Sequence, residues 1–514
     1  MGTRRYLVFA LLLSGCAARG PSPQLTAEAA KAQALYSEGC YTCLKESFAI
    51  YQKHLLLKQP PIGTAERAFD TALLIALREK ELGMPSSDST KAALQLVVPG
   101  RMPLLDAADL VIGDTTGLDP NQRALVTGRN RPAIEPDNPK RRALDAFPQN
   151  DLAARYIALA IDCEQPKLIE SVNAKALMQT YSGVPLMQFR VMTCGRPDVP
   201  GVATLRAADP RWTDTLYWEG RAELGSSRGR SIDFPKALGF FARGRDAFPQ
   251  SLMLAMAWAN TNLAAEEFES ALAGFDAVIA RYPTHRDALN GRMQALSYLM
   301  RHDEGIAAAT RLLDLGTWHI GDANYWRAWN RYQVKDYEPA WVDVENAARG
   351  LSDARVYMLA GLIAYARKNL PIAIDRFDRA FQIDSTACDA VWMSGLVSID
   401  QNELGTAAPK FTRGMTCFVS SAAALRRDAA DLEAAIAKRG TPATARERRG
   451  IDKSRKDADN AEEKSAQSAF NAAQCYARTG QKTMALTHVD VAIAHPAMRE
   501  KALALKAAIE KLPN

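Results

Sequence analysis

The chain has 514 residues, 47% of them hydrophobic, which is enough to bury the cores of more than one domain. Its formal net charge of +6 is small for this length, so composition gives no reason to expect nucleic acid or an anionic surface as the main partner. Alanine is abundant, and β-branched residues and glycine are sparse in the periodic segments, which favours an all-α fold.

The N-terminus has the pattern of an export signal. Arg4 and Arg5 precede an apolar run at 6–13, which is too short to span a bilayer because a spanning helix needs about 20 residues. The run ends in Leu-Ser-Gly-Cys, with the cysteine at Cys16, and this ending resembles the lipobox of bacterial lipoproteins. The resemblance implies a signal peptide at 1–15, removed on export, and lipidation of Cys16. An ordinary signal peptide with a chance cysteine is the alternative.

Several acyl chains on one cysteine would hold the protein firmly on a membrane, whereas one chain alone is marginal. Residues 16–26 are then the lipidated cysteine and a short tether. Ala17 follows Cys16, and in Gram-negative lipoproteins this implies the outer membrane. We therefore expect a protein of the cell envelope, anchored by lipid to the outer membrane and facing the periplasm.

The segment 27–210 is predicted to be a degenerate region of helical repeats. We expect one helix pair at 29–58 turning at Gly39, and an amphipathic helix at 69–82 that ends before Gly83. A long loop with a short helix is expected at 113–140. Further helices are predicted at 151–163, 171–181 and 185–194.

Seven cysteines besides Cys16 lie in a compartment that permits disulfides. Cys40 and Cys43 form a CxxC, for which a local disulfide or paired thiols are favoured over redox chemistry, because no βαβ setting surrounds it. Cys163 and Cys194 end two helices separated by one other, so in an alternating array both ends lie on the same side. Cys388 begins one helix and Cys417 ends the antiparallel helix after it. Each of these two pairs is predicted to be close enough to bridge.

The segment 211–420 contains an internal repeat. Small residues recur in the second helix of each unit, with intervals of 36, 33, 33 and 34, at Ala271, Ala307, Ala340, Ala373 and Ala407. A matching small position in the first helices falls at Ala259, Ala295, Ala328, Gly361, Gly395 and Ala473. These linked positions resemble tetratricopeptide (TPR) repeats, whose period is about 34 residues. Two features depart from the family pattern: Arg311, where an aromatic residue is expected, and an apparent insertion at 225–234.

The resemblance implies a right-handed α-solenoid of helix pairs that grips peptides or proteins on its concave face. Residues 421–465 are predicted to be a charged helical connector, and a solvated helix of alternating charge is favoured over a docking strip. One long helix is expected over 444–480. Residues 466–514 are predicted to form a terminal repeat and a capping helix, the latter at 498–512.

In TPR proteins the first helix of each pair lines the groove. Carrying that over by alignment places in the groove Met253, Met256, Leu289, Arg292, Leu296, Tyr325, Trp329, Tyr332, Met358, Leu362, Tyr365 and Trp392. Methionine and rigid aromatic residues around an arginine are typical of peptide-binding hot spots. Inter-repeat core is the competing interpretation, and it is favoured for Trp326.

No motif for catalysis is present. The six histidines are scattered without zinc-ligand spacing, and the sequence has no nucleophile elbow or phosphate-binding loop. We therefore expect a protein that is not an enzyme and has no metal or cofactor.

The predicted function is a non-catalytic, membrane-anchored TPR lipoprotein that acts as a scaffold for envelope proteins or peptides and does not bind nucleic acid. The alternative is a helical outer-membrane lipoprotein that binds a small ligand or sugar on an aromatic groove. Acidic and amide clusters beside the aromatics would favour sugar, whereas the Met- and Leu-rich flanks favour a peptide.

Overall fold

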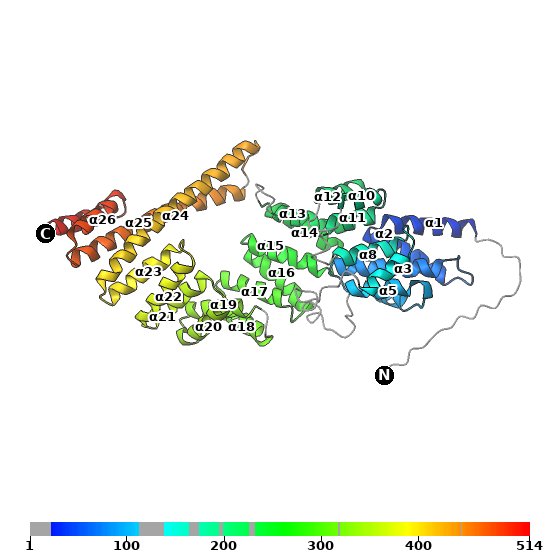
Figure 1. Ribbon diagram of the computed structural model, residues 1–514, viewed down its shortest axis with the longest axis horizontal. Coiled ribbons are helices and arrows are strands. Elements are labelled where there is room, and N and C mark those ends of the chain that lie inside the picture. The colour runs from blue at the N-terminus through cyan, green and yellow to red at the C-terminus, as the bar shows by residue number, and fades with distance from the viewer. Residues whose placement is uncertain are drawn as a thin grey trace. The chain divides into compact units, whose positions relative to one another are not determined.

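The computed structural model describes residues 22–112, 138–163, 174–194, 199–225, 232–316, 319–440, 442–443 and 445–513. The regular elements of these residues are all helices, which confirms the predicted all-α class (Figure 1). They divide into two compact units, the first ending at His285 and the second beginning at Arg286. The division falls inside the array predicted at 211–420.

The first unit begins with helices that were predicted only as a loose series. Its α-helices are α1 (Pro23–Glu38), α2 (Tyr41–Leu55), α3 (Thr64–Glu81), α4 (Asp88–Leu94), α5 (Met102–Ile112), α7 (Pro139–Arg142), α8 (Leu152–Cys163), α10 (Ala174–Thr180), α11 (Pro185–Thr193), α12 (Val199–Ala208), α13 (Leu216–Leu224), α14 (Phe234–Ala247), α15 (Leu252–Ala264) and α16 (Phe268–Arg281). Short 3-10 turns are η1 (Pro99–Arg101), η2 (Ala143–Ala146) and η3 (Thr213–Thr215). The pair expected at 29–58 is α1 and α2, turning at Gly39 with a left-handed φ of 73°.

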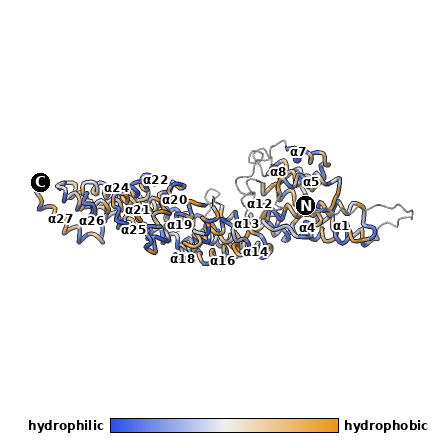
Figure 2. Tube along the Cα trace, turned by 90° about the horizontal axis from the view of Figure 1, so that it is seen from below, coloured by the Kyte–Doolittle hydropathy of each residue, from blue (hydrophilic) through white to orange (hydrophobic). Residues whose placement is uncertain are grey.

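The second unit consists of longer, more regular helices. They are α17 (Arg286–Tyr298), α18 (His302–Asp314), α19 (Ile320–Gln333), α20 (Tyr337–Gly350), α21 (Ala354–Ala366), α22 (Leu370–Ile383), α23 (Cys388–Asp400), α24 (Leu404–Arg439), α25 (Ala445–Arg478), α26 (Lys482–Ala494) and α27 (Arg499–Glu510). Hydrophobic and hydrophilic residues alternate along them (Figure 2), as expected for helices that bury one face.

The helix pairs keep the TPR period. The first helices α15, α17, α19, α21 and α23 each begin 34 residues after the one before. Each pair turns through one residue with a left-handed backbone, at Glu266, Met300, Lys335, Lys368 and Asn402, with φ between 57° and 63°. The backbone amide of the third residue after the helix then bonds back into its last turn, as Asp336 does to the carbonyl of Arg331 at 2.8 Å. A repeated backbone hydrogen bond therefore sets the angle between the helices of each pair.

The small position of the second helices differs from its predicted register at one repeat. Ala271, Ala340, Ala373 and Ala407 are fully buried as expected, but Ala307 is exposed and Gly305 is buried in its place. A Cβ at Gly305 would lie 2.7 Å from the side-chain amide nitrogen of Asn330, so any other residue there would have to displace that buried side chain. The repeat pattern in the sequence placed an expected aromatic residue at Arg311, four residues after Ala307. Because the small position is Gly305, the corresponding position is instead the buried Ala309.

The core of the first unit is built around a buried arginine on α3. The Arg78 guanidinium is ion-paired with Glu81 and with Asp214 of η3, and it lies 4.3 Å from the ring centroid of Phe189 in α11. The Tyr156 hydroxyl of α8 donates to Glu81 at 2.7 Å. Because a buried charge is tolerated only when it is paired and hydrogen-bonded, this network fixes how α3, α8 and α11 pack.

Three disulfides join the cysteines that the sequence paired. Cys163 at the end of α8 is bonded to Cys194 just after α11, with their Cα atoms 5.2 Å apart. Cys388 at the start of α23 is bonded to Cys417, with a Cα separation of 5.5 Å. Cys417 does not end its helix as predicted, because α24 continues to Arg439.

The third disulfide joins Cys40 and Cys43 within the first turn of α2, and both residues are buried. Because burial shields both sulfur atoms from an attacking thiol, this bond has the character of a structural disulfide and not of a redox-active one. Cys475 is a buried free cysteine in α25, and burial raises the pKa of its thiol to about 11.

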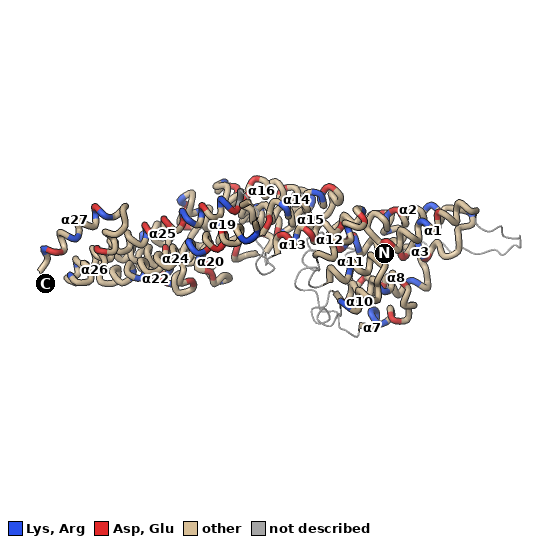
Figure 3. Tube along the Cα trace, turned by 90° about the horizontal axis from the view of Figure 1, so that it is seen from above, with Lys and Arg blue, Asp and Glu red and all other residues tan. Residues whose placement is uncertain are grey.

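Helices α24 and α25 form an antiparallel hairpin that extends beyond the neighbouring pairs of its unit (Figure 1). The long helix expected over 444–480 is α25. The boundary expected at 420 falls inside α24, so 421–465 is the distal part of this hairpin and not a separate connector. Its charged residues pair across the two helices: Arg426 with Asp459 and Glu462, and Arg455 with Glu433. Acidic and basic residues are interspersed along the other helices (Figure 3).

The N-terminal predictions fall mostly outside the described residues. The signal peptide at 1–15 and Cys16 are among the residues that the structure does not describe. Of the predicted tether, 23–26 belong to α1, which is capped by the Ser22 hydroxyl accepting from the Leu25 amide at 3.3 Å. Among the described helices, none combines the length and the apolar character needed to cross a membrane.

Candidate binding surface

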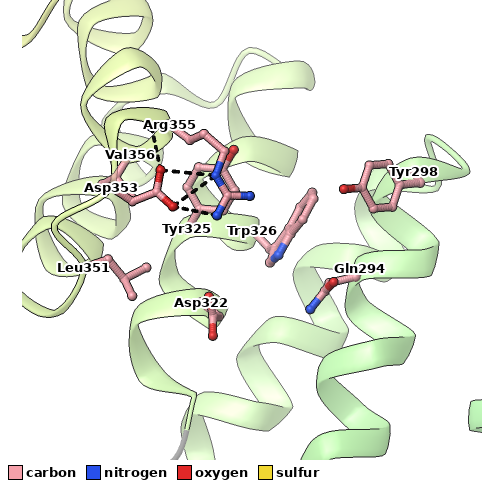
Figure 4. Close-up of a pocket in the computed structure, with 9 residues that line it drawn as sticks. All are labelled: Gln294, Tyr298, Asp322, Tyr325, Trp326, Leu351, Asp353, Arg355 and Val356. Carbon is pink, nitrogen blue, oxygen red and sulfur yellow. Dashed lines mark hydrogen bonds and ion pairs between the residues drawn. The ribbon is translucent and has the colours of Figure 1, made fainter. Parts of the chain in front are cut away.

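The first helices of three successive repeats in the second unit meet around a cavity of about 140 Å³. Its walls come from α17, α19, α21 and the turn before α21 (Figure 4), and they are Gln294, Tyr298, Asp322, Tyr325, Trp326, Leu351, Asp353, Arg355 and Val356. A cavity of about 150 Å³ accommodates a benzene ring. This cavity is therefore sized for one side chain and is smaller than a typical pocket for a drug-sized ligand.

Three aromatic rings form a continuous wall of this cavity. Trp326 lies edge-on to Tyr298, with ring centroids 5.2 Å apart, and edge-on to Tyr325 at 5.3 Å. The wall extends from the protein interior to the surface, because Trp326 is 8% exposed and Tyr298 is 50% exposed. Such edge-to-face contacts fix the ring planes and keep a rigid surface available.

Charged groups opposite the rings are paired with one another. The Arg355 guanidinium donates to both carboxylate oxygens of Asp353, at 2.6 and 3.2 Å, and lies 5.7 Å from the ring centroid of Tyr325 (Figure 4). This pairing holds the pKa of Asp353 below its usual range, and burial raises the pKa of Tyr325. The cavity thus offers apolar rings beside a neutralised ion pair.

A histidine next to the cavity joins two further carboxylates. His319 lies 2.7 Å from Asp287 of α17 and 3.5 Å from Asp322, a cavity residue. The hydrogen bond with Asp287, and then that with Asp322, raises the pKa of His319 to about 9. His319 is therefore protonated near neutral pH and ties α19 to α17.

Buried polar residues position the aromatic helix α19. Asn330 is fully buried; its amide donates to the Ser297 hydroxyl of α17 at 2.7 Å, and its oxygen faces His302 of α18 at 2.9 Å. On the other side, the buried Asp343 of α20 accepts from Arg327 at 2.6 Å and from Arg331 at 2.8 Å. Because each buried polar group has its partners, α19 has one well-defined orientation.

Of the predicted groove residues, only Tyr325 lines this cavity. Trp329 and Tyr332 are half-buried against the core of their own repeat pair, and Met358 and Tyr365 are half-buried against the next core cluster. Trp392 is half-buried between two clusters, and Arg292 is half-buried on α17. Met256 belongs to the first unit and is also half-buried.

Two groove predictions are wrong, and seven of the nine cavity residues were not predicted. Leu289 and Leu296 are buried core residues, at 1% and 0% exposure. The cavity residues that the sequence did not point to are Gln294, Tyr298, Asp322, Leu351, Asp353, Arg355 and Val356. Asp353 and Arg355 lie at the start of α21 and Tyr298 at the end of α17, outside the positions that the repeat alignment assigned to the groove. Trp326, assigned to the core, is both buried and part of the wall.

The first unit contains a larger cavity of about 450 Å³. Its lining comes from α1, the start of α3, η1, the segment before α8, and the turn before α11. Within this lining, Arg101 bridges the carboxylates of Asp70 and Asp151. Burial raises the pKa of Asp70 to about 7 in spite of that pairing. Amides and tyrosines also line this cavity, namely Gln33, Gln149, Asn150, Tyr36 and Tyr181, together with the basic Arg67 and Arg155.

One group of metal-ligand types occurs among the described residues, at Glu38, Cys43 and Asp209. Cys43 is held in a disulfide, and Arg211 pairs with Glu38 at 2.8 Å and with Asp209 at 2.9 Å. An arginine therefore already supplies the positive charge at this position.

No protein-family model and no curated protein matches the chain. Solved structures that are similar to it are helical-repeat proteins. The C-terminal part of a TPR repeat-containing protein from Cytophaga hutchinsonii aligns at 12% identity and a TM-score of 0.40, over 57% of this chain and 98% of that one. A tetratricopeptide repeat protein from Parabacteroides merdae ATCC 43184 aligns at 10% identity and 0.35, over 58% and 99%.

A third similar structure is YrrB, described as a TPR protein with an unusual peptide-binding site. It aligns at 16% identity and a TM-score of 0.33, over 45% of this chain and 97% of that one. Because these sequence identities and TM-scores are low, the evidence for TPR-like repeats is the 34-residue spacing and the repeated turns of the chain itself.

Proposed function

We propose that the protein is a non-catalytic scaffold that holds a peptide segment of a partner protein, and that one side chain of that segment enters the cavity between α17, α19 and α21. The observation that supports this most directly is the size of the cavity, which suits a single side chain, together with its wall of three aromatic rings. Rigid aromatic pockets with a neighbouring arginine are typical of binding hot spots.

The proposal includes a location in the cell envelope, with the chain anchored to the outer membrane through a lipid on Cys16. Its support is the sequence at 1–16, which has the features of a lipoprotein signal. A partner would then be another envelope protein.

Photo-crosslinking tests the peptide site. A benzophenone residue placed at Tyr298, the exposed edge of the wall, is expected to capture a partner protein in the native envelope. The same residue at Val342, which is 58% exposed on the second helix α20, serves as the matched control. Equal capture at both positions would contradict the proposal.

Substitution gives the quantitative measure. With the captured partner segment made as a peptide, Tyr298→Ala should weaken binding by roughly 30-fold or more, as for a hot-spot loss of about 2 kcal/mol, and leave the melting temperature unchanged. Tyr325→Ala with Trp329→Ala is a poorer test, because both rings also pack on the repeat core. If Tyr298→Ala binds the peptide with unchanged affinity, the peptide binds at another surface and the proposed cavity is wrong.

A second candidate function is favoured by the cavity of the first unit. Its acids and amides beside two tyrosines form the combination that suits a polyhydroxylated ligand, and its volume of about 450 Å³ is in the range of small-molecule pockets. Saturation-transfer NMR with cellobiose, maltose and chitobiose, compared between the wild type and Gln149→Ala with Asn150→Ala, tests this function. Absence of transfer to all three sugars would reject it for that class.

A further inference from the structure

A local excess of positive charge lies at the distal end of the α24–α25 hairpin. We define the arm as residues 426–463 and its tip as residues 438–456; residues 441 and 444 and the side chains of 445 and 446 lie outside the described residues and form no part of the proposed site. The sequence of the tip contains eight Lys or Arg and two Asp or Glu, a net charge of +6. Without Arg446, whose side chain lies outside the described residues, its net charge is +5. The rest of the arm has two arginines and seven acidic residues, a net charge of −5.

The hairpin brings the charges of the tip together from two helices. Lys438 and Arg439 lie at the end of α24, and the remaining described cations follow early in α25. Two of these cations form ion pairs with carboxylates: Arg439 pairs with Glu447, and Arg455 pairs with Glu433. Lys438, Arg449 and Lys456 are exposed and have no carboxylate partner within the described part of the chain. The tip therefore retains uncompensated positive charge in water.

The arm contributes little to the repeat core. Among its described residues, the buried side chains are small or few: Ala429, Ile451, Ala458 and Ala461. The described ion pairs of Arg426, Arg439 and Arg455 all join α24 to α25. A capping role would need only the proximal part of the hairpin, where Ala469, Ala472 and Phe411 pack with α26. The length of the arm thus has no explanation in the stability of the repeats.

The surface of the tip restricts what it can bind. The arm has no Phe, Trp or Tyr, and none of its described large hydrophobic side chains is exposed. Specific protein interfaces have an apolar or aromatic centre, and single-stranded nucleic acids are held by stacking on aromatic rings. Binding to the phosphates of a lipid bilayer requires neither an apolar centre nor aromatic rings, because an anionic bilayer attracts basic residues by charge alone.

We propose that the arm tip docks on the anionic head groups of a lipid bilayer. The acidic proximal part is repelled from the same surface, so the arm meets the membrane with its end. This contact is independent of the peptide cavity and would orient the repeats with respect to the membrane, in addition to any lipid attached at Cys16.

Vesicle sedimentation tests the proposal with the full chain carrying Cys16→Ala, so that no acyl chain contributes. Vesicles of phosphatidylcholine with phosphatidylglycerol are compared with pure phosphatidylcholine at low salt, and the difference between the two measures charge-dependent binding. The triple variant Lys438→Gln, Arg449→Gln and Lys456→Gln is expected to reduce that difference on the order of 100-fold, because each basic residue contributes roughly fivefold.

The matched control removes the same charge elsewhere in the same unit. Arg379→Gln, Arg413→Gln and Lys501→Gln replace three exposed cations without a carboxylate partner in the described residues, and binding should stay within about twofold of the wild type. Equal losses in the two triple variants would show a net-charge effect and overturn the proposal. Wild-type binding to polyglutamate or to an oligonucleotide, with none to the anionic vesicles, would overturn it as well.

Discussion

At five turns of the repeat array, a residue with a side chain has the left-handed backbone that glycine adopts most easily. A side chain in this conformation costs about 1–2 kcal/mol, and asparagine is affected least. The residues at these five turns are Glu266, Met300, Lys335, Lys368 and Asn402. The backbone hydrogen bond that closes each turn offsets the cost.

The first residue-scale prediction follows from this strain. Lys335→Gly should raise the free energy of unfolding by about 0.5–1 kcal/mol, because the gain in backbone conformation exceeds the entropy lost with glycine. Asn402→Gly, the matched control, should change it by less than half as much. Denaturant unfolding of both variants measures the difference. A loss of stability in Lys335→Gly would mean that its side chain has a role the turn geometry does not reveal.

The second residue-scale prediction concerns pH. The folded-state pKa of His319 is about 9, above its unfolded value near 6.5, so its stabilising contribution is complete below pH 6.5 and is lost as the pH rises to 9. His319 is partly exposed, which limits the effect to about 1 kcal/mol, or roughly 2–4 °C in melting temperature. In His319→Gln the melting temperature should fall less over this window than in the wild type. Parallel pH curves would refute the assignment.

At the scale of elements, close contact between the two helices of a pair depends on small residues facing large ones. A Cβ at Gly361 of α21 would lie 2.5 Å from the ring of Phe377 in α22, which is fully buried. The backbones of this pair can approach only because that position lacks a side chain. The same arrangement recurs at Gly395 and Phe411, where the distance is 3.0 Å.

Gly361→Ala should therefore lower the free energy of unfolding by about 1–3 kcal/mol through overpacking. Gly405→Ala in α24 is the control, because no atom lies within 4 Å of its added Cβ, and helix propensity should there raise stability by about 0.5 kcal/mol. Chemical denaturation of both variants tests the pair. A neutral Gly361→Ala would mean that α21 and α22 can separate at little cost.

At the scale of the whole molecule, the described residues contain no membrane-spanning helix, and the predicted lipid at Cys16 is the anchor that the sequence offers. Cys16→Ala should prevent labelling by an alkyne fatty acid and release the chain from the membrane fraction at high salt. High salt matters because it screens the arm tip, whose attraction to head groups would otherwise keep part of the protein bound. Labelling or pelleting that persists in Cys16→Ala at high salt would reject the lipoprotein prediction.

The sequence by itself determined the elements that local physics controls. The 34-residue period, the turn at Gly39 and the long helix α25 follow from the spacing of hydrophobic residues and glycine. The pairing of Cys163 with Cys194 follows from which helix ends meet in an alternating array. These features depend on residues near one another along the chain, or on the simple alternation of helices, and they need no knowledge of side-chain contacts.

Tertiary structure decided the rest. The Ala-rich run 307–309 left the register of α18 open, and the contact between Gly305 and Asn330 selects it. The half-burial of Trp329 depends on how α19 packs on its own repeat, while the cavity at Tyr298 requires residues from three helices. The charge of the arm looked alternating along the sequence, but folding back at residue 440 gathers the cations at one end. Each of these outcomes depends on contacts between residues far apart in the chain, which a single sequence does not record.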